Sequence, residues 1–252
     1  DRRTAVADAS VDKVAAIVSQ DISMSAKILQ VINSPFYGLR TQVTNPTQAV
    51  ALLGLNSVKS LVLSTKVFAQ FDQSKLPFFS IDVLWRHGTA VGATSKAITK
   101  EERMDREAQE DAFTAGLLHD IGILILATNF PDKYTEVLAL MQEKNIQDWE
   151  AELAIVGTTH AEIGGYVLAN WGLSEHTVEA VGYHHDPAKC TSGIVNPLLA
   201  VHVANSVEEE QEAEASGRPA TPTDAACLTA CDLSDRLPIW RAICLDARNR
   251  RA

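Results

Sequence analysis

The sequence predicts an all-α fold, a multi-helix bundle preceded by an N-terminal helical subdomain, and three observations lead to this prediction. Apolar residues such as Val14, Ile17 and Val18 recur at three- and four-residue spacings, as on the buried face of a helix. Residues that cap or break helices divide the chain into segments of helical length. Alternating patterns with turn dipeptides, which would indicate strand hairpins, are missing from the sequence.

In the first part of the chain, proline and asparagine mark the ends of the predicted helices. The residue before a proline avoids the helical region, so Ser34-Pro35 predicts the end of a helix. Asn45-Pro46 predicts the next start, with asparagine as the N-cap and proline at the first helical position. Gly54 and Asn56 interrupt residues 49–71, which predicts two short helices or a single bent one.

Most predicted helices of the second part begin at a capping residue. Thr159 and Glu162 have the spacing of a capping box, which places His160 in a first helical turn. The apolar segment 111–127 contains the pair His119-Asp120, and residues 216–223 form a predicted flexible stretch. The other helix starts are predicted at Ser80, Asp132, Asp148, Ser174, Asn196 and Asp224.

Composition restricts the classes of function. A net charge of -10 argues against broad binding to DNA phosphates. No apolar run is long enough for a membrane span, and four cysteines without a CxxC pair favour core positions in a reducing cytoplasm. The opening residues look like the cut end of a longer chain, which leaves room for an upstream domain. An acidic run is interpreted as a solvated helix end or loop: Glu208, Glu209, Glu210, Glu212 and Glu214.

The main candidate for a functional site is the pair His119-Asp120, which supplies a nitrogen and an oxygen ligand side by side. Such a pair suits manganese, iron, zinc or magnesium. A His-Asp pair alone is more often a helix cap, and a lone histidine on an apolar helix is more often a core residue. The order of the full set raises the metal hypothesis above these readings: His87, His119, Asp120, His160, His184 and His185.

That order resembles the HD superfamily of metal-dependent phosphohydrolases and, more closely, the HDOD output domain of bacterial signalling proteins. The resemblance extends from about Val11 to about Val207. It implies a linker or cut end over 1–10, an N-terminal helical part over 11–75, an HD-like bundle over 76–210 and a loop with a helical tail over 211–252. The matching motifs are residues 30–39 (QVINSPFYGL), 49–58 (AVALLGLNSV), 116–122 (GLLHDIG), 160–164 (HAEIG), 171–173 (WGL) and 201–205 (VHVAN).

Two departures from the catalytic relatives are visible in the sequence. The closing carboxylate of the superfamily falls on Asn205, whose amide oxygen is a weaker ligand for a hard divalent ion. The cyclic-di-GMP phosphodiesterase relatives carry lysine where Ile123 stands here, and a Gly-Tyr-Pro motif where Asp186-Pro187 follows the paired histidines. The parts that would grip a phosphate are therefore missing from their usual places.

These departures favour a noncatalytic cytoplasmic signalling module that acts through a partner protein or neighbouring domain, such as the output domain of a response regulator. The alternative is a metal-dependent phosphohydrolase or phosphodiesterase that acts on a nucleotide. In that alternative His87, His119, Asp120 and His184 hold one metal, His160 and His185 hold a second metal or the substrate phosphate, and Asp120 is the expected catalytic residue.

Overall fold

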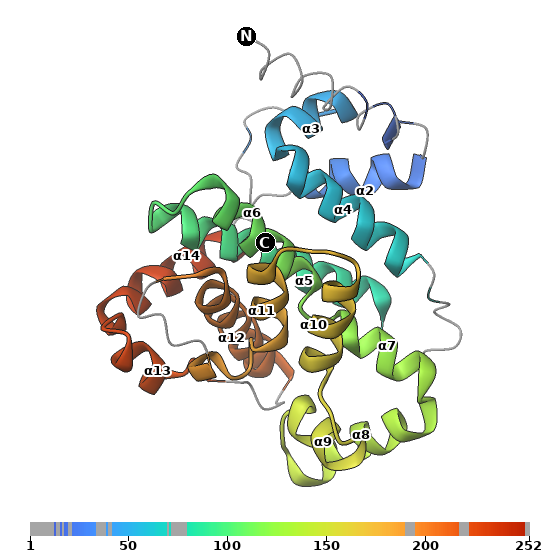
Figure 1. Cartoon of the computed structure of the whole chain (residues 1–252), viewed down its shortest axis with the longest axis vertical. Coiled ribbons are helices and arrows are strands. Elements are labelled where there is room, and N and C mark those ends of the chain that lie inside the picture. The colour runs from blue at the N-terminus through green and yellow to red at the C-terminus, as the bar shows by residue number, and fades with distance from the viewer. Residues whose placement is uncertain are drawn as a thin grey trace. The chain divides into compact units, whose positions relative to one another are not determined.

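The computed structural model describes residues 13, 16, 18–19, 22–33, 39, 42–69, 71, 80–189, 195–216 and 222–249. Within these residues the structure is helical and contains no strand, which confirms the all-α prediction (Figure 1). The chain divides into two compact units, Asp1–Gln70 with Asp246–Ala252, and Phe71–Leu245. Every candidate ligand lies in the second unit.

The first unit contains α2 (Ile22–Ile32), α3 (Pro46–Leu53) and α4 (Leu55–Phe68). Asn45 caps α3 as predicted, because its side chain accepts a hydrogen bond from the Thr47 backbone. Gly54 separates α3 from α4 with a φ of 86°, so the predicted alternative of two short helices is the observed one. The amide of Asn33 pairs with both backbone groups of Val43 at 2.7 Å. The predicted helix end at 34–35 lies outside the described residues.

The second unit is a larger helical bundle. Several predicted starts are confirmed by capping hydrogen bonds, from Ser174, Asn196 and Asp224 among others. Its helices are α5 (Ile81–Glu101), α6 (Arg106–Leu118), α7 (Ile121–Asn129), α8 (Pro131–Lys144), α9 (Asp148–Ile155), α10 (His160–Asn170), α11 (Glu175–Gly182), α12 (Pro197–Ser216), α13 (Ala225–Ala230) and α14 (Leu237–Asn249), of which residues up to Leu245 belong to this unit.

Two predicted helix starts were wrong by one residue. Asp148 was predicted as the N-cap of α9, but Gln147 stands there, where Glu150 accepts a hydrogen bond from its backbone N–H, and Asp148 is the first helical residue. Pro131 rather than Asp132 begins α8. The capping box of Thr159 and Glu162 is present, and His160 is the first residue of α10 as predicted.

The helices α5 and α6 cross at three glycines without intervening side chains. A Cβ on Gly116 would lie 2.6 Å from the Gly92 Cα, and a Cβ on Gly92 would lie 2.6 Å from the Phe113 carbonyl oxygen. A Cβ on Gly88 would lie 2.6 Å from the Leu117 carbonyl oxygen. Gly88 directly follows His87, and Leu117 lies two residues before His119. The crossing therefore brings the end of α6, with His119, close to His87 on α5.

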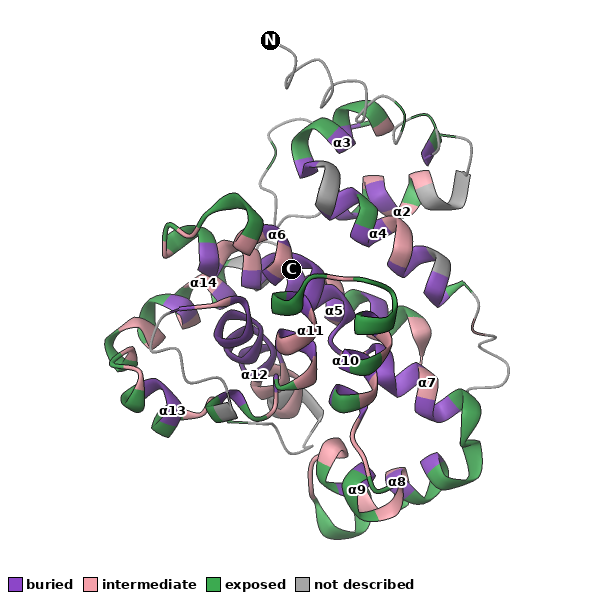
Figure 2. Cartoon of the chain, viewed as in Figure 1, coloured by how far each residue is buried: buried purple, intermediate pink, exposed green. Residues whose placement is uncertain are grey.

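Most residues of the two helices that flank His119-Asp120 are buried. The stretch Arg106–Asn129 is long and apolar enough by composition to cross a membrane, and 72% of its apolar window is buried inside the protein. It packs against α5, α10, α11 and α12 (Figure 2). This packing accounts for the apolarity of the segment.

We expect Gly116→Ala to reduce the free energy of unfolding by about 3 kcal/mol or more, because the added methyl group meets backbone that cannot move aside. Gly182→Ala is the matched control, since a Cβ there meets nothing within 4 Å. Urea denaturation of both variants measures the difference. A Gly116→Ala protein as stable as the Gly182→Ala protein would contradict the close crossing.

Candidate metal centre

Four of the predicted ligands, all histidines, lie around one carboxylate, that of Asp120 at the junction of α6 and α7. His185, the remaining histidine, contacts His160 instead. Asp120 Oδ1 lies 3.1 Å from His119 Nε2, 3.5 Å from His160 Nε2 and 4.0 Å from His184 Nε2. Asp120 Oδ2 lies 3.8 Å from His87 Nε2. The ligands come from α5, the α6–α7 junction, the start of α10 and the end of α11, so residues far apart in the chain meet at one point.

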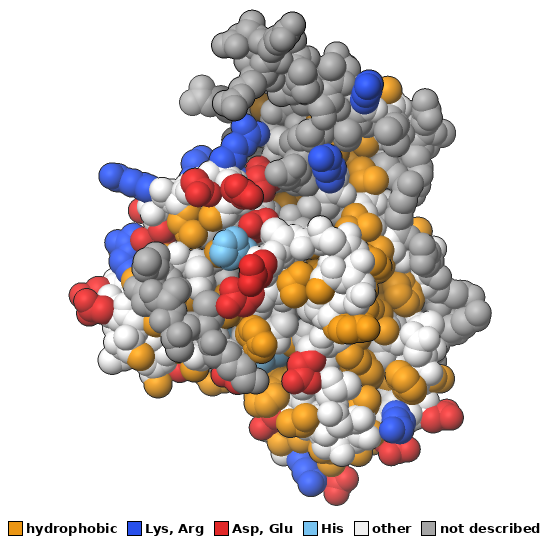
Figure 3. Space-filling view, viewed as in Figure 1, with side chains coloured by type: hydrophobic (Ala, Val, Ile, Leu, Met, Phe, Trp, Pro, Cys, Tyr) orange, Lys and Arg blue, Asp and Glu red, His pale blue; other side chains and the backbone are white. Residues whose placement is uncertain are grey.

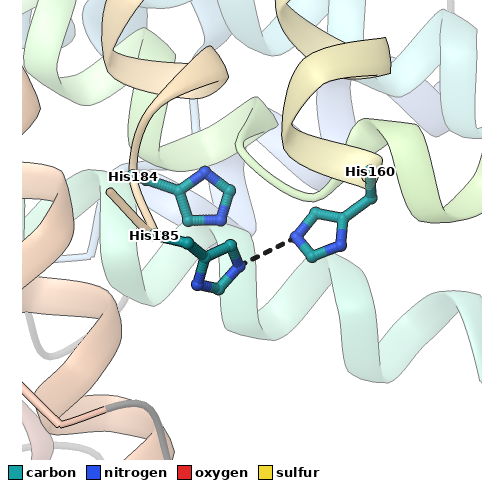
Figure 4. Close-up of side chains that lie close together, drawn as sticks. All are labelled: His160, His184 and His185. Atoms are coloured by element: carbon teal, nitrogen blue, oxygen red, sulfur yellow. Dashed lines mark hydrogen bonds between the residues drawn. The ribbon is translucent and has the colours of Figure 1, made fainter. Parts of the chain in front are cut away.

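The ligand atoms form two groups, each with its members within 4.8 Å of one another. His87, His119 and Asp120 make the first group. The second group is His160, His184 and His185, and Figure 4 shows the three rings facing one another from two chain segments. His160 Nε2 and His185 Nε2 are 3.0 Å apart, so one of these nitrogens donates to the other.

Asp120 does not act as a helix cap, although it occupies the N-cap position of α7. Its side chain makes no capping hydrogen bond and turns toward the histidines instead. Gly122 makes this arrangement possible, because a Cβ at that position would collide with the backbone carbonyl of His160. The beginnings of α7 and α10 can therefore approach closely enough for Asp120 and His160 to meet.

The histidines are held in the tautomer that a metal requires. His119 Nδ1 donates to the Gly116 carbonyl and His184 Nδ1 donates to the Val181 carbonyl, each at 2.8 Å. A backbone acceptor at Nδ1 leaves Nε2 free as a ligand. In the described part of the chain, the Nε2 atoms of His119 and His184 are buried and have no hydrogen-bond partner. Such orphaned nitrogens beside a carboxylate fit a divalent ion of the first transition row.

A buried carboxylate that the sequence did not single out orients His160. Glu152 on α9 accepts from the His160 backbone N–H at 2.6 Å and from His160 Nδ1 at 2.8 Å. Both side chains are fully buried. A carboxylate behind a histidine ligand fixes the ring and makes Nε2 a better donor to a metal.

The charges in this centre are strongly coupled. Burial would lower the pKa of His87, but the Glu212 and Asp120 carboxylates outweigh it and raise that pKa to about 10. Burial opposes the cation at His160 too, and Glu152 and Asp148 raise its pKa to about 10. Burial alone would raise the pKa of Asp120, yet the adjacent histidines hold that pKa well below its ordinary range.

The pKa values of two further histidines, His184 and His185, are shifted in the opposite direction. Burial and the neighbouring imidazoles hold the pKa of His184 and of His185 well below the ordinary value. His160 is therefore the donor to His185, and the metal-free centre balances its carboxylates with protons on His87 and His160. Trp149 stacks on the His185 ring, with centroids 5.8 Å apart and planes inclined by 27°.

Of the other positions that the sequence singled out, Asn205 and His202 contact histidines of the centre. Asn205 Oδ1 is 2.9 Å from His87 Nε2, so the amide stands beside the first ligand group. His202 is a structural residue, because its Nδ1 donates to the His184 carbonyl and its Nε2 accepts from the Asp224 backbone. Ile123 is buried, with 8% of its surface exposed.

The interpretation of the acidic run as a solvated helix end was wrong. Glu208 is buried, Glu210 forms a two-pronged ion pair with Arg241, and Glu212 Oε1 lies 3.5 Å from His87 Nδ1. Glu209 accepts a hydrogen bond from Asn205. A run of like charges carries no local signal that one of its faces will turn inward, so the sequence could not predict these contacts. Glu152 could not be predicted either, because it lies in no recognisable motif.

We expect Glu152→Ala to reduce the free energy of unfolding by about 3–5 kcal/mol, because it strands a buried histidine and a buried backbone N–H. Glu143→Ala, on the exposed side of α8, is the control for loss of one acidic charge. Chemical denaturation measures both. Equal effects of the two substitutions would show that Glu152 does not support His160.

Metal-free protein is expected to lose stability as the pH rises from about 7 to about 9.5. The pKa values of His87 and His160 are raised from 6.5 to about 10, so their contribution is complete below pH 6.5 and is lost toward pH 10. Thermal midpoints of chelator-treated protein measure the trend. His87→Gln should flatten it, whereas His176→Gln, at an exposed position on α11, should leave it unchanged.

Comparison with known proteins identifies the family of this chain. An uncharacterized protein of Treponema pallidum (strain Nichols) is 23% identical over 182 residues, a match that covers 71% of this chain and 34% of that protein. The chain thus spans about a third of the length of that relative.

Solved structures share the fold. A candidate phosphohydrolase from Shewanella amazonensis SB2B has 19% identity and a TM-score of 0.63, with 96% of this chain and 93% of that chain covered. A candidate signal transduction protein from Marinobacter aquaeolei VT8 has 19% identity and a TM-score of 0.60, with 95% of this chain and 55% of that chain covered. The family model of the HDOD domain matches residues 2–187, and the chain therefore belongs to the HDOD domain family.

Proposed function

We propose that the chain is a signal-transduction module that acts through contacts with a protein partner or a neighbouring domain, without turnover of a substrate. The enclosure of the ligand set carries this proposal. His119 and His160 have no exposed surface, His184 is 1% exposed, and the side chains of His87 and Asp120 are only 10% and 16% exposed. Histidine also occupies little of the described surface on the face shown in Figure 3. A phosphate ester must reach the ligands to react, and three of the six are closed to solvent.

The electrostatics of the centre support the same conclusion. Its histidines and Asp120 make their hydrogen bonds and ion pairs with one another, with Glu152, Glu212 and Asn205, and with backbone carbonyls. Carboxylates of this kind repel a phosphate. Ile123 offers an apolar side chain where the cyclic-di-GMP phosphodiesterase relatives have a lysine.

The centre is nonetheless suited to hold a divalent ion such as zinc, manganese or iron, with Asp120 and the Nε2 atoms of the histidines as ligands. Such an ion would act as a Lewis acid. In this chain its larger effect would be structural, because the ligands join four separate segments of the bundle. Binding only to the folded protein stabilises the fold by mass action.

The setting of related domains supports a signalling role in the cytoplasm, for example as the output domain of a response regulator. The matched region is 34% of the Treponema protein and 55% of the Marinobacter chain, so these proteins carry further sequence beside it. The Marinobacter protein is a candidate signal transduction protein. A module of this kind needs no chemistry of its own, since its partner or neighbour supplies the output.

A metal-dependent phosphohydrolase acting on a nucleotide is the second candidate function. It is favoured by the clustering of six candidate ligands in two adjoining groups, more than a purely structural ion would require. The Shewanella relative is a candidate phosphohydrolase. In this case His160 and His185 would hold a second ion or the substrate phosphate, and Asp120 would be the catalytic residue.

Turnover assays separate these two functions. The protein purified with manganese, iron or zinc should contain metal by elemental analysis. It should hydrolyse neither bis(p-nitrophenyl) phosphate nor a cyclic dinucleotide faster than a blank that contains the metal alone. Asp120→Asn should lose the metal, and with it the rise in thermal midpoint that added zinc causes. Turnover that the wild type shows and a folded Asp120→Asn protein lacks would establish the phosphohydrolase instead.

Signalling output gives an independent test of the partner proposal. The Asp120→Asn protein, if its circular dichroism and thermal midpoint match those of the metal-free wild type, should retain its output in the bacterial host. Contacts on the outside of the bundle do not depend on the buried carboxylate. Output that fails in this folded variant, together with metal-dependent turnover in the wild type, would overturn the noncatalytic proposal.

A further inference from the structure

Asn205 poses a chemical problem for the centre. It is 2% exposed and stands beside His87, where a closing carboxylate would offset the charge of an ion. An amide is neutral and a weaker oxygen ligand than a carboxylate. A centre that binds a divalent ion through this position needs another source of negative charge close to the amide.

Glu209 is that source in the structure. Asn205 Nδ2 donates to Glu209 Oε1 at 2.6 Å, across one turn of α12. Asn205 in turn stands 2.9 Å from His87 Nε2, so the Glu209 carboxylate is one side chain removed from the first ligand group.

The hydrogen bond determines which way the amide faces. An amide nitrogen can only donate and a carboxylate can only accept, so the NH₂ group must point to Glu209. The amide oxygen is then directed to His87 Nε2, at 2.9 Å. A charge-assisted hydrogen bond to the NH₂ group also draws electron density toward the oxygen, which makes that oxygen a stronger ligand.

We propose that Glu209 is a positioning residue of the metal centre, which holds the Asn205 oxygen toward the ion and supplies the charge that Asn205 lacks. The inference rests on the proposal that the centre holds a divalent ion. The buried Nε2 atoms of His119 and His184, which face Asp120 and have no hydrogen-bond partner among the described residues, independently indicate such a ligand. The Asn205–Glu209 pair then does the work of one carboxylate, divided between two residues a helical turn apart.

Metal affinity of the full chain tests this role without reference to activity. Chelator-treated protein is titrated with Zn²⁺ against a competing dye, and with Mn²⁺ followed by electron paramagnetic resonance. Glu209→Gln should weaken binding by about 10- to 100-fold, as loss of a residue that orients a ligand does. Glu210→Gln is the matched control: it removes the same charge from the next residue, which pairs with Arg241. Its affinity should stay close to that of the wild type.

The double variant N205D/E209Q distinguishes positioning from a general effect of charge. A carboxylate at 205 needs no orienting partner, so this protein should bind at least as tightly as the wild type. The inference is overturned if Glu209→Gln binds like the wild type, if Glu210→Gln weakens binding equally, or if the double variant stays as weak as Glu209→Gln. Should Glu209→Gln not fold, Glu209→Asp, which withdraws the carboxylate by one methylene, replaces it in the same comparison.

Failure of the underlying proposal gives a different result. If neither the wild type nor Asn205→Asp binds either ion, the centre holds no metal, and both the metal proposal and the role of Glu209 are overturned. If Asn205→Asp binds and the wild type does not, the histidines are competent ligands and Glu209 does not compensate for the amide. That second result overturns the inference alone.

Discussion

The contact between the backbones of α5 and α6 determines where the candidate ligands lie. At Gly88, Gly92 and Gly116 the two helices touch without side chains between them. His87 precedes the first of these glycines, and His119 follows the last by three residues. A wider crossing would separate the two histidines and leave Asp120 facing only part of its set. Gly122, which also lacks a side chain, likewise allows α7 to approach the backbone of His160.

Charge balance is the second constraint on the bundle. Five histidines and Asp120 are brought together with Glu152, Glu209 and Glu212, and most of these groups are shielded from water. Such a cluster is stable only when positive charge compensates the carboxylates. Two protons on imidazoles or one divalent ion can provide that charge, so the same scaffold accommodates both. This explains how an HDOD bundle can keep its ligand set whether or not it performs chemistry.

Local sequence signals predicted local structure well. The capping box at Thr159 and the Asn45 cap depend on neighbouring residues, and both are present. The order of the histidines predicted the family, and the resemblance to that family named six candidate ligands, which the fold places close together. Glu152 and Glu209 escaped prediction because their roles depend on contacts with α10 and with an amide one turn away. Asp148 was predicted as a cap from its residue type, yet a glutamine one position earlier took that place.

The contacts of the centre have a consequence for the order of folding. His87 and Asn205 are 118 residues apart in the chain, and His160 and His185 are 25 apart. Closing loops of such length costs conformational entropy before any contact forms, so these pairings come after the local helices. We therefore expect the nascent chain to fold its helical hairpins first and to assemble the histidine cluster last. An ion would then enter a nearly finished bundle, and the supply of metal in the cell would affect how long the protein stays folded rather than how fast it folds.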